Sequence, residues 1–355
     1  MEYLDIEYGN AGSRTHRYGA VAQKAVNRAR EQVAGVVDCS AEEVIFTSGA
    51  TESNNLAILG LAAGAEGARK RHIVTTAIEH KAVLEPIEYL RTRGFEITHI
   101  PPRQNGRVSA EDVLSAVRQD TLLISLMHVN NETGVIQPID EVAEQLSGGG
   151  PFFHVDAAQG FGKDLDRLKH RRIDLISISG HKVHAPKGIG ALVAKRRAHR
   201  RAPLIPRQFG GGQERGYRAG TIPVFLVAAL GVAAELSVRD FSDRRAKCIR
   251  FRELLLEALF PLAPTIIGEP EVCLPNVICV RFGYLDSEVV ILALKDKLAI
   301  SNGSACTSAE IQPSHVLSAM GLNEAECNAY TRWSWCHLTQ TPDWHGLTSA
   351  LERLI

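Results

Sequence analysis

One lysine stands in a setting that favours nucleophilic amine chemistry. Lys182 lies in the run SGHKVHAPKGIG (179–190), where a short apolar stretch ends in Ser, Gly and His before a loop rich in Pro and Gly. An amine that is partly desolvated or set among cations has a lowered pKa and attacks an aldehyde to form a Schiff base. A solvated loop lysine is the commoner alternative. The interpretation therefore depends on the residues that accompany Lys182.

Two further features supply what a pyridoxal 5'-phosphate (PLP) cofactor needs. Asp156 follows the apolar run FFHV, and a carboxylate there can pair with a pyridinium nitrogen so that the ring acts as an electron sink. The run FTSGATES (46–53) places small and hydroxyl residues between a predicted strand and a predicted helix, where backbone N–H groups bind phosphate. Each feature alone also fits ordinary helix capping. Together with Lys182 they predict a PLP site.

The elements that must position these groups are short β-rich runs that alternate with helix-like stretches between residues 43 and 194. The runs are VIFTSG, HIVTTAI, EITHI, TLLISLMHV, FFHVDA, LISIS and IGALVA. This alternation predicts an α/β fold with a mostly parallel sheet covered by helices on both faces. In such sheets, ligand-binding groups gather at the carboxyl ends of the strands. Those ends carry GATES (49–53), IEH (78–80), NNE (130–132), DAAQ (156–159) and SGHK (179–182), so we expect one site to collect them.

A change in the sequence pattern near residue 238 indicates a second domain. The apolar run PVFLVAALGVAAEL (223–236) predicts a buried helix, and a charged stretch then leads to the strand-like runs NVICVRF and LAISNGSACTS. We therefore expect a large domain over residues 10–238 and a smaller α+β domain over residues 239–355. Residues 1–9 are expected to pack on the smaller domain.

Composition restricts the classes of partner. The 40 Lys and Arg residues balance the 40 Asp and Glu residues, so we expect nucleic-acid contacts to be at most indirect, although the basic run AKRRAHRR (194–201) fits a docking surface or a solvated face. The first twenty residues lack a signal-like apolar segment and no apolar stretch is long enough to cross a bilayer, so we expect a cytoplasmic protein without membrane contact. The seven cysteines show no metal-ligand spacing, and neither a metal site nor a disulfide framework is expected.

The order and spacing of these motifs resemble the cysteine desulfurases of the NifS/IscS type, which are PLP enzymes related to class V aminotransferases. The resemblance rests on FTSGATESNN, AIEH, HVNNETGV, HVDAAQ, SGHK, APKGIGAL, GGGQERGYRAGT and SNGSACTSA, and it covers almost the whole chain. It implies the PLP-dependent fold type I, with a mostly parallel seven-stranded sheet in the large domain and a smaller α+β C-terminal domain.

The resemblance also implies a role for each matching residue. Lys182 would form the Schiff base with PLP and later move the Cα proton of the substrate, and His80 would stack on the ring and act as acid or base. The implied cofactor-binding residues are Lys182, Ala50, Thr51, His80, Asp156, Gln159, Ser179, His181 and Thr221, and the implied substrate-binding residues are Asn131 and Arg332. Because the family's threonine at the Thr221 position contacts the phosphate of the neighbouring subunit, a homodimer is implied.

Cys306 distinguishes sulfur transfer from the other reactions of this scaffold. It lies in SNGSACTSAE, a run of small residues, whereas Cys273 and Cys279 lie in apolar surroundings typical of inert buried thiols. A flexible loop suits a nucleophile that must reach the cofactor and then deliver its cargo. The implied activity is conversion of L-cysteine to L-alanine, with the sulfur carried as a persulfide on Cys306 and passed to an acceptor protein. Cys327 and Cys336 are the alternative thiols.

Several alternatives stay open. A selenocysteine lyase or a class V aminotransferase would use the same PLP scaffold, and a non-catalytic partner protein would retain the fold. The acceptor of the sulfur is expected to belong to DNA phosphorothioation, tRNA thiolation or iron–sulfur assembly. The short stretch after Arg332 favours a specialised acceptor over the housekeeping iron–sulfur pathway.

The N-terminal region departs from the family pattern. Members usually begin with a strand like YLD (3–5), followed by a helix and a loop before a segment like GNAGSRTHRYG (9–19). Here YLD is followed almost at once by EYGN (7–10), as though about twenty residues were missing by the usual arithmetic of a helix and a loop. Either a segment is missing from the numbered chain, or one wall of the active site is open and activity is doubtful.

Overall fold

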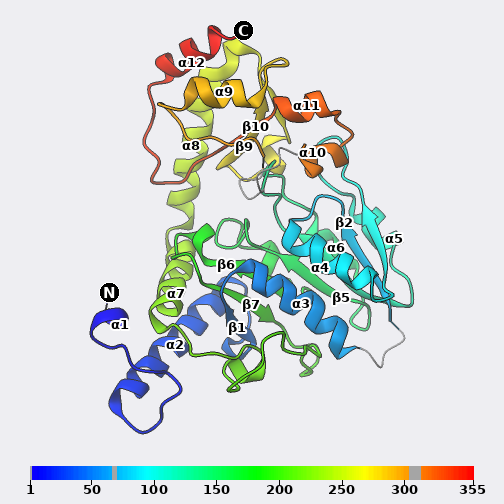
Figure 1. The fold of residues 1–355 in the computed structure, drawn as a ribbon, viewed down its shortest axis with the longest axis vertical. Coiled ribbons are helices and arrows are strands. Elements are labelled where there is room, and N and C mark those ends of the chain that lie inside the picture. The colour runs from blue at the N-terminus through cyan, green and yellow to red at the C-terminus, as the bar shows by residue number, and fades with distance from the viewer. Residues whose placement is uncertain (1, 66–69, 304–312) are drawn as a thin grey trace. The chain divides into compact units, whose positions relative to one another are not determined.

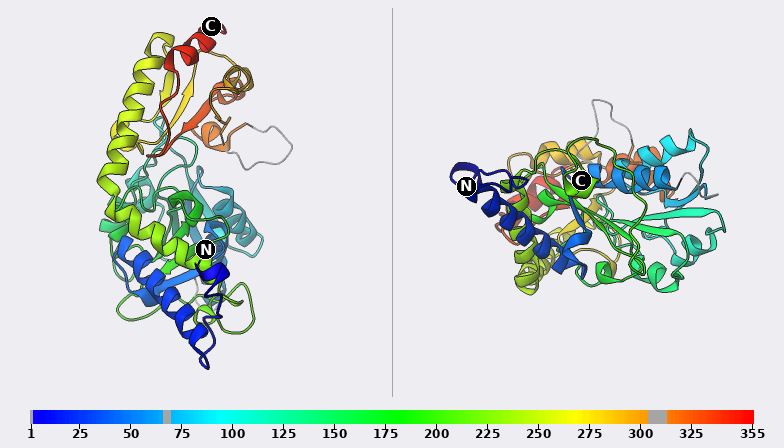
Figure 2. Two further views of the ribbon diagram at one scale, coloured as in Figure 1. Left: turned by 90° about the vertical axis from the view of Figure 1, so that its left-hand side faces the viewer. Right: turned by 90° about the horizontal axis from the view of Figure 1, so that it is seen from below.

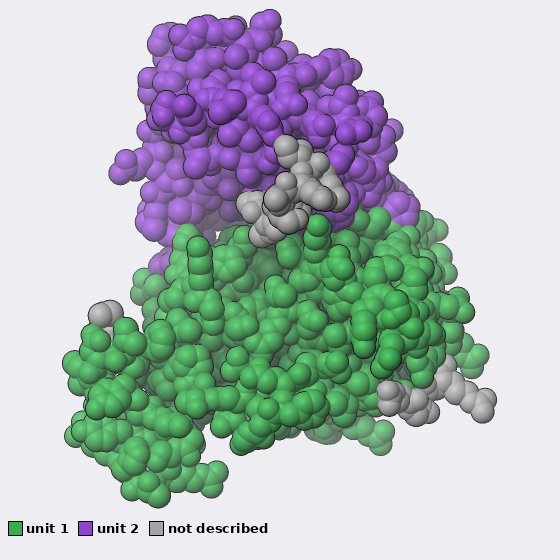
Figure 3. Space-filling view, in the orientation of Figure 1, with its two compact units in different colours: residues 1–100, 110–128, 138–239 green, residues 101–109, 129–137, 240–355 purple. Residues whose placement is uncertain are grey.

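The computed structural model describes residues 2–65, 70–303 and 313–355, and its contacts divide the chain into two units (Figures 1 and 3). Unit 1 comprises residues 1–100, 110–128 and 138–239, and unit 2 comprises residues 101–109, 129–137 and 240–355. Residues 1–9 are thus grouped with unit 1, whereas the sequence predicted that they pack on the smaller domain. The two short segments that belong to unit 2 were not predicted, because nothing in their composition separates them from the surrounding large domain.

Unit 1 is built on a seven-stranded sheet in the order β1-β7-β6-β5-β4-β2-β3. The strands are β1 (Val44–Thr47), β2 (His72–Thr76), β3 (Glu96–Ile100), β4 (Thr121–Met127), β5 (Phe152–Asp156), β6 (Leu175–Ser179) and β7 (Gly190–Ala194). The helices are α1 (Glu2–Asp5), α2 (Arg17–Val36), α3 (Ala50–Gly64), α4 (Lys81–Arg91), α5 (Ala110–Ser115), α6 (Ile139–Gln145) and α7 (Val224–Arg239). All seven predicted strands are confirmed, as is the helix predicted from residues 223–236.

The sheet is mostly parallel. Strand β7 alone runs antiparallel to its neighbours β6 and β1, and the pairs β6–β5, β5–β4, β4–β2 and β2–β3 are parallel. Apart from the edge strand β3, nearly every strand residue is buried, which is the pattern of strands covered on both faces. Helix α3 packs across β5, β6, β7 and β1, and its Leu56 and Leu61 join the core with Ile45 and Leu192.

Small residues allow α2 and α7 to lie side by side, as both views in Figure 2 show. A Cβ atom on Gly231 of α7 would lie 2.6 Å from the Cα atom of Ala29 in α2, so the two helix backbones meet where neither side chain is large. The next residue of α2, the buried Arg30, donates to Glu214, whose carboxylate also accepts from the Phe46 amide at 2.8 Å. Residue 214 and its loop are thereby fixed to β1.

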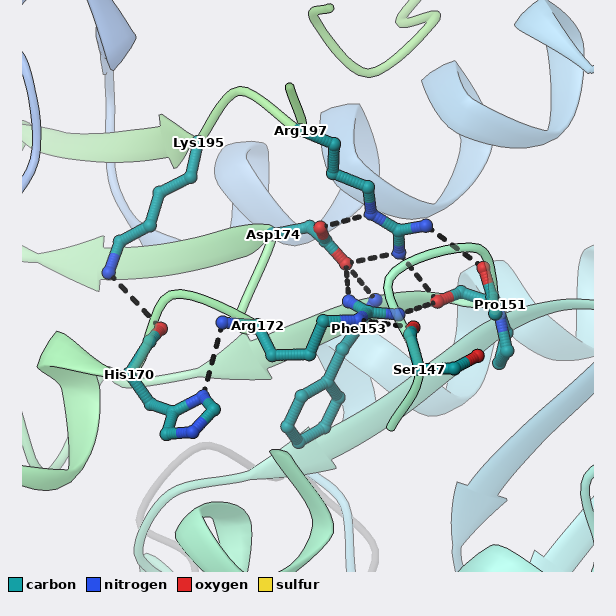
Figure 4. A network of polar contacts seen from close by, with 9 residues as sticks. Ser147, Pro151, Phe153, His170, Arg172, Asp174, Lys195 and Arg197 are labelled. Carbon is teal, nitrogen blue, oxygen red and sulfur yellow. Dashed lines mark hydrogen bonds and ion pairs between the residues drawn. The ribbon is translucent and has the colours of Figure 1, made fainter. Parts of the chain in front are cut away.

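A buried ion-pair network closes the edge of the sheet at which β5 and β6 begin (Figure 4). The carboxylate of Asp174, the residue before β6, accepts from Arg172 and Arg197 at 2.6 Å and from the Phe153 amide at 2.7 Å. Arg197 also donates to Pro151 O and lies 4.4 Å from the ring centroid of Phe152. Because β7 is antiparallel, its carboxyl end brings Arg197 to the amino ends of β5 and β6.

Unit 2 consists of a three-stranded antiparallel sheet with helices packed on it. Its strands are β8 (Thr265–Ile267), β9 (Val277–Arg281) and β10 (Thr331–Ser334), in the order β10-β9-β8. Its helices are α8 (Phe241–Leu259), α9 (Ser287–Leu294), α10 (His315–Ala319), α11 (Glu324–Ala329) and α12 (Trp344–Glu352). The core joins Leu255 of α8 to Val280 of β9, Trp333 of β10 and Leu347 of α12. The predicted strand NVICVRF is confirmed as β9.

Two smaller expectations are wrong. The run LAISNGSACTS forms no strand in its described part, residues 298–303, where Ser301 makes an isolated bridge with Arg332 and Gly303 has a φ of +90° that breaks an extended chain. The YLD segment is helical rather than extended, because it has no partner strand and the Ile6 amide bonds to Glu2 O at 3.0 Å. The chain continues through Ile6 without a break in the numbering. In the described parts of the chain, no helix has both the length and the apolar character needed to cross a membrane.

The Asp174 network predicts a large effect on stability. Replacing Asp174 with Asn removes the charge that two arginines share in a buried site, so we expect Asp174→Asn to lower the free energy of unfolding by roughly 3–5 kcal/mol. Urea denaturation measures this change. The matched control is Asp166→Asn, because the Asp166 side chain is 94% exposed and pairs with Lys169 at the surface, and its effect should stay below about 1 kcal/mol. Equal effects of the two substitutions would contradict the prediction.

Candidate active site

The carboxyl ends of the parallel strands of unit 1 bring most of the predicted cofactor-binding residues to one edge of the sheet. Strand β1 points in the same direction as β6, because each runs antiparallel to β7. Ala50 and Thr51 therefore follow the end of β1, and His80 follows the end of β2. Asp156 and Gln159 lie at the end of β5, and Ser179 to Lys182 lie at the end of β6. The NNE segment (130–132), which the sequence placed at the same edge, belongs to unit 2 and is described with that unit.

The register of β7 sets the phosphate-binding candidates side by side. Gly190 is paired with Thr47 of β1 on one side and with Ser179 of β6 on the other. A Cβ atom on Gly190 would lie 2.6 Å from the Cα atom of Gly49 and 2.4 Å from Ile178 O. The loop that starts α3 thus rests directly on the β7 backbone, next to Ser179, and only glycine leaves room for it.

The start of α3 has the geometry of an anion site. Its N-cap is Gly49, which offers no side chain to the first N–H groups of the helix, so the amides of Ala50 and Thr51 are oriented toward the sheet edge without a capping side chain. Ser179 Oγ lies 3.0 Å from His181 Nδ1. Burial, together with the nearby positive charge of Lys182 among others, lowers the pKa of His181, so the ring is neutral at pH 7 and keeps one N–H donor.

A brace holds this loop in place. Glu52 accepts from the Ser48 amide at 2.8 Å and from the Arg218 guanidinium at 2.9 Å. Burial alone would raise the pKa of Glu52, but these hydrogen bonds outweigh it and hold the pKa below its ordinary value. Arg218 belongs to the segment that ends in Thr221, whose side chain is exposed. Thr221 therefore lies on a fixed loop at the surface. It is separate from the start of α3 and from Ser179, the candidate phosphate-binding groups on either side of β7.

Asp156, at the end of β5, is buried with neutral hydrogen-bond donors. Its Oδ1 accepts from the Ala158 amide at 2.9 Å, and its Oδ2 accepts from the Asn54 side chain at 2.8 Å. Burial raises the pKa of Asp156, while these two hydrogen bonds act in the opposite direction. Among the described residues, no lysine or arginine forms an ion pair with this carboxylate. A bound cation such as a pyridinium N–H would supply the missing partner.

The loop that carries Gln159 is fixed by close packing against a histidine. A Cβ atom on Gly160 would lie 1.9 Å from His128 Nδ1, so only glycine fits beside the imidazole. The other ring nitrogen of His128 lies 3.2 Å from the carboxylate of Asp164. Half-buried Gln159 is therefore held between the Asp156 carboxylate and a tightly packed turn, which suits a side chain that must bind a ring substituent at a set position.

His80, predicted to bind the cofactor ring, caps helix α4 in the structure. It is the N-cap of α4, and its Nδ1 accepts from the Ala82 amide at 3.0 Å. This bond assigns the ring proton of the neutral imidazole to Nε2 and fixes the plane of the ring. The preceding residue, Glu79, is fully buried and accepts from the Thr76 hydroxyl at 2.7 Å and the Met127 amide at 2.8 Å. Burial raises the pKa of Glu79 to about 8, with a smaller contribution from Asp156.

Lys182 lies in the short connection that turns the chain from β6 into the antiparallel strand β7. It is part of a 3-10 helix, Gly180–Val183, which ends at His184 in a left-handed conformation with φ 73°. Its side chain is half-buried, while the following Val183 is buried and anchors the turn. The lysine is therefore presented from a rigid turn at the same sheet edge as Asp156.

In unit 2, the two predicted substrate-binding residues lie together. Arg332 lies in β10, where it is paired with Cys279 of β9, and its Nη1 donates to Asn131 O at 3.0 Å. Among the described residues, this carbonyl is the single hydrogen-bond partner of the guanidinium. The remaining N–H groups of Arg332 are available as a planar fork for a carboxylate.

Cys306 lies outside the described residues, but the residues that flank 304–312 share one contact. The carboxylate of Glu132 accepts from Ser314 Oγ at 2.5 Å, and its Oε2 would lie 3.2 Å from a Cβ atom on Gly303. Ser301 Oγ donates to Gly303 O at 3.4 Å. Glu132, which follows the predicted residue Asn131, thus bonds to Ser314 after the segment that contains Cys306 and lies close to Gly303 before it.

Most of the other thiols are poorly suited to nucleophilic attack. Burial raises the pKa of Cys39 to about 12 and of Cys273 to about 11, and it raises the pKa of Cys279 and Cys327 as well. A thiol with a raised pKa holds its proton at neutral pH, and the thiolate is the reactive species. The half-buried Cys336 remains as the alternative to Cys306.

The residues of unit 1 fit PLP by the chemistry of their donor set. A phosphate would be held by the amides of Ala50 and Thr51 and by Ser179 and His181, and the buried, unpaired carboxylate of Asp156 matches a protonated pyridine nitrogen. These groups share one sheet edge with Lys182, whose amine binds an aldehyde.

Sequence reasoning missed three residues that support this site. Asn54 contacts Asp156, Glu79 joins the ends of β2 and β4, and Glu132 bonds to Ser314 and lies close to Gly303. Asn54 and Glu79 are polar residues in otherwise apolar or helical surroundings, so their type was the available signal. Glu132 gave no such signal, because its contacts with Gly303 and Ser314 join residues far apart in the chain.

Comparison with known proteins agrees with this geometry. Residues 1–343 match the family described as Aminotransferase class-V. The chain is 43% identical over 340 residues to the cysteine desulfurase IscS of Serratia proteamaculans, covering 94% of this chain and 82% of that protein. The solved structure of DndA from Streptomyces lividans is 46% identical with a TM-score of 0.84, covering 96% of this chain and 94% of that one. A structure described as SspA in complex with cysteine is 36% identical with a TM-score of 0.82, covering 94% and 92%.

These similarities extend over both units and include every motif from which the sequence predicted the site. The fold of the class V enzymes, the lysine between β6 and β7 and the unpaired Asp156 occur together in one chain. The chain therefore belongs to the class V aminotransferase family and, within it, to the PLP-dependent cysteine desulfurases of the NifS/IscS type.

Proposed function

We propose that the chain converts L-cysteine to L-alanine and carries the sulfur as a persulfide on Cys306 to an acceptor protein. The observation that carries the proposal is the buried carboxylate of Asp156, at the same sheet edge as Lys182. It has neutral donors and, in the described part of the chain, no paired cation. Cysteine as the substrate is supported by the similarity to SspA, whose structure contains cysteine.

The residues of the chain divide the work. Lys182 holds the cofactor through its amine and later moves the Cα proton of the substrate. His80 would stack on the cofactor ring, with Nε2 as its proton-bearing nitrogen. When bound, PLP supplies an electron sink that stabilises negative charge at the substrate Cα. Arg332 and Asn131 bind the substrate carboxylate and orient it.

The sulfur transfer balances without a further redox partner. The Cys306 thiolate attacks the sulfur of the substrate, the new S–S bond forms, and the bond between that sulfur and the substrate Cβ breaks with its electron pair left on carbon. Protonation of that carbon, together with return of a proton to Cα by Lys182, gives L-alanine, and Cys306 keeps one extra sulfur atom. The high pKa values of the buried thiols disfavour them as nucleophiles, and Cys306 is preferred to Cys336 because of its run of small residues.

We further propose that two chains form a homodimer in which Thr221 contacts the cofactor phosphate of the partner subunit. Thr221 is exposed at the end of a loop that Glu214 fixes to β1, and the large apolar side chain of Phe209 in the same region is 79% exposed. An exposed apolar surface beside a rigid polar loop is typical of a subunit interface.

The acceptor we propose is a specialised sulfur-transfer protein, of the kind that acts in DNA phosphorothioation. The 46% identity to DndA supports this assignment, and the 43% identity to IscS makes an iron–sulfur acceptor the alternative. Trapping the labelled persulfide in an extract and identifying the protein that receives the label tests it. Transfer to an iron–sulfur scaffold alone would contradict the assignment.

Substitutions of Lys182 and of Cys306 should affect different steps, cofactor binding in the first case and sulfur transfer in the second. We expect Lys182→Ala to lose the visible absorbance of the lysine-bound cofactor and to lower turnover at least about a hundredfold, because the proton-transfer group is removed. Cys306→Ser should keep the absorbance and lose persulfide formation, measured by labelling with radioactive cysteine. Cys336→Ser is the matched control. Full turnover in Cys306→Ser would transfer the nucleophile's role to another thiol.

Arg332 should affect substrate binding more than chemistry. Arg332→Lys keeps the charge but loses the planar fork, so we expect the KM for L-cysteine to rise about tenfold, or about 1.4 kcal/mol, with a smaller change in kcat. Steady-state measurement of alanine separates the two constants. Arg250→Lys, in an exposed pair with Glu253, is the control. An unchanged KM would remove Arg332 from the substrate site.

Gly190 should control the phosphate site although it binds nothing itself. A Cβ atom there would collide with Gly49 and displace the start of α3, so we expect Gly190→Ala to weaken PLP binding by at least about tenfold. Titration of the apoprotein with PLP measures the change. Gly35→Ala is the control, because a Cβ atom on Gly35 has nothing within 4 Å. Equal affinities of the two variants would show that the close approach at Gly190 is unimportant.

A further inference from the structure

We propose that Asn54 is a positioning residue that links the phosphate-binding start of α3 to the carboxylate of Asp156, so that both anchors of the cofactor belong to one rigid body. The inference rests on the proposed roles of Ala50, Thr51 and Asp156 in holding PLP. It adds a residue whose side chain does not touch the cofactor and whose effect passes entirely through Asp156.

The geometry places Asn54 between the two anchors. Asn54 lies four residues after Ala50, one turn into α3, and its side chain is fully buried. Its Nδ2 donates to Asp156 Oδ2 at 2.8 Å. The same helix therefore offers its first amides to a phosphate and, one turn later, a side-chain donor to the carboxylate at the end of β5.

Among the described residues, the Asn54 bond is the single hydrogen bond that reaches the Asp156 carboxylate from another element. The other donor, the Ala158 amide, lies two residues along the same chain and bonds to the other oxygen at 2.9 Å. Two donors on two different oxygens fix the plane of a carboxylate, whereas one leaves it free to turn about χ2. Without Asn54, the carboxylate is held only by its own turn.

The start of α3 is itself fixed to the sheet. Ser53 is fully buried, and its Oγ lies 2.8 Å from Thr47 Oγ1 of β1. Thr47 Oγ1 also lies within 3.2 Å of Gly49 O, to which it donates. Ser53 thus ties α3 to β1, and the adjacent Asn54 ties it to β5. The helix therefore connects the two cofactor anchors, the phosphate-binding loop and Asp156, across the sheet.

The chemistry of asparagine suits this position. A lysine or arginine at residue 54 would pair with Asp156 and compete with a pyridinium, and an aspartate would place a second negative charge against it. The Oδ1 atom of Asn54 is buried without a hydrogen-bond partner among the described residues. An unsatisfied buried acceptor opposes folding, so stability alone does not account for an asparagine here, whereas the donor to Asp156 does.

The test compares two ligands that differ only in the ring nitrogen. Apoprotein is titrated with PLP and with 1-deazapyridoxal 5'-phosphate, in which carbon replaces that nitrogen. We expect Asn54→Ala to raise the Kd for PLP about tenfold, the effect of losing one hydrogen bond to a charged group, and to change the Kd for the deaza compound by less than about twofold. Asn55→Ala is the matched control, because the Asn55 side chain bonds to Thr51 O of its own helix, and it should change neither Kd.

Equal loss of both ligands in Asn54→Ala would mean a general distortion of the site and would overturn the proposal, as would no loss of PLP. Thermal unfolding of the apoprotein accompanies each titration. If Asn54→Ala unfolds early, Asn54→Leu, which keeps the volume without the donor, repeats the comparison and gives the same selective loss.

A second experiment distinguishes failure of the proposed role of Asn54 from failure of the proposed role of Asp156. Asp156→Asn should itself remove the preference for PLP over the deaza compound, and adding Asn54→Ala should then cost nothing more, because both changes act on one contact. If Asp156→Asn removes the preference but Asn54→Ala keeps it, the role of Asn54 is wrong and that of Asp156 stands. If Asp156→Asn keeps the preference, the proposed role of Asp156 fails and the inference about Asn54 fails with it.

Discussion

The site depends on the burial of one carboxylate. Asp156 ends a central strand where water is excluded, and an ionised carboxylate is costly there unless it is hydrogen-bonded and paired. Neutral donors from Asn54 and Ala158 meet part of this cost, and a positively charged ring nitrogen can meet the rest. The same desolvation strengthens the interaction once the partner is present, because charges attract more strongly in a medium of low polarity.

The remaining features of unit 1 arrange the sheet edge around that carboxylate. Strand β7 is the element on which this arrangement rests, because its antiparallel course places Gly190 between Thr47 and Ser179 and so joins two loops that are distant in the chain. The turn that reverses the direction from β6 to β7 also carries Lys182. One local reversal in an otherwise parallel sheet therefore positions both the phosphate cradle and the reactive amine.

Sequence reasoning predicted what depends on local pattern and missed what depends on packing. The seven strands, the helix that became α7 and the grouping of Asp156 with Lys182 followed from apolar runs and from polar residues at their ends. The bond from Asn54 to Asp156 and the position of Gly190 could not be read in this way, because they depend on side-chain direction and strand register. The YLD segment was misjudged because a strand requires a neighbour, and no neighbouring strand is visible in a short sequence window.

The Asp174 network lies at the opposite edge of the sheet from the cofactor groups, where β5 and β6 begin (Figure 4). In parallel strands, the carboxyl ends face the ligand, so the amino ends are available for contacts that stabilise the fold. Active-site groups such as Asp156 commonly lower the stability of the folded state, and proteins tolerate them when contacts elsewhere supply enough stability. Strands β5 and β6 carry the stabilising contacts of Asp174 at their amino ends. The loops around Lys182, at the carboxyl ends, can therefore change toward new substrates without loss of these contacts.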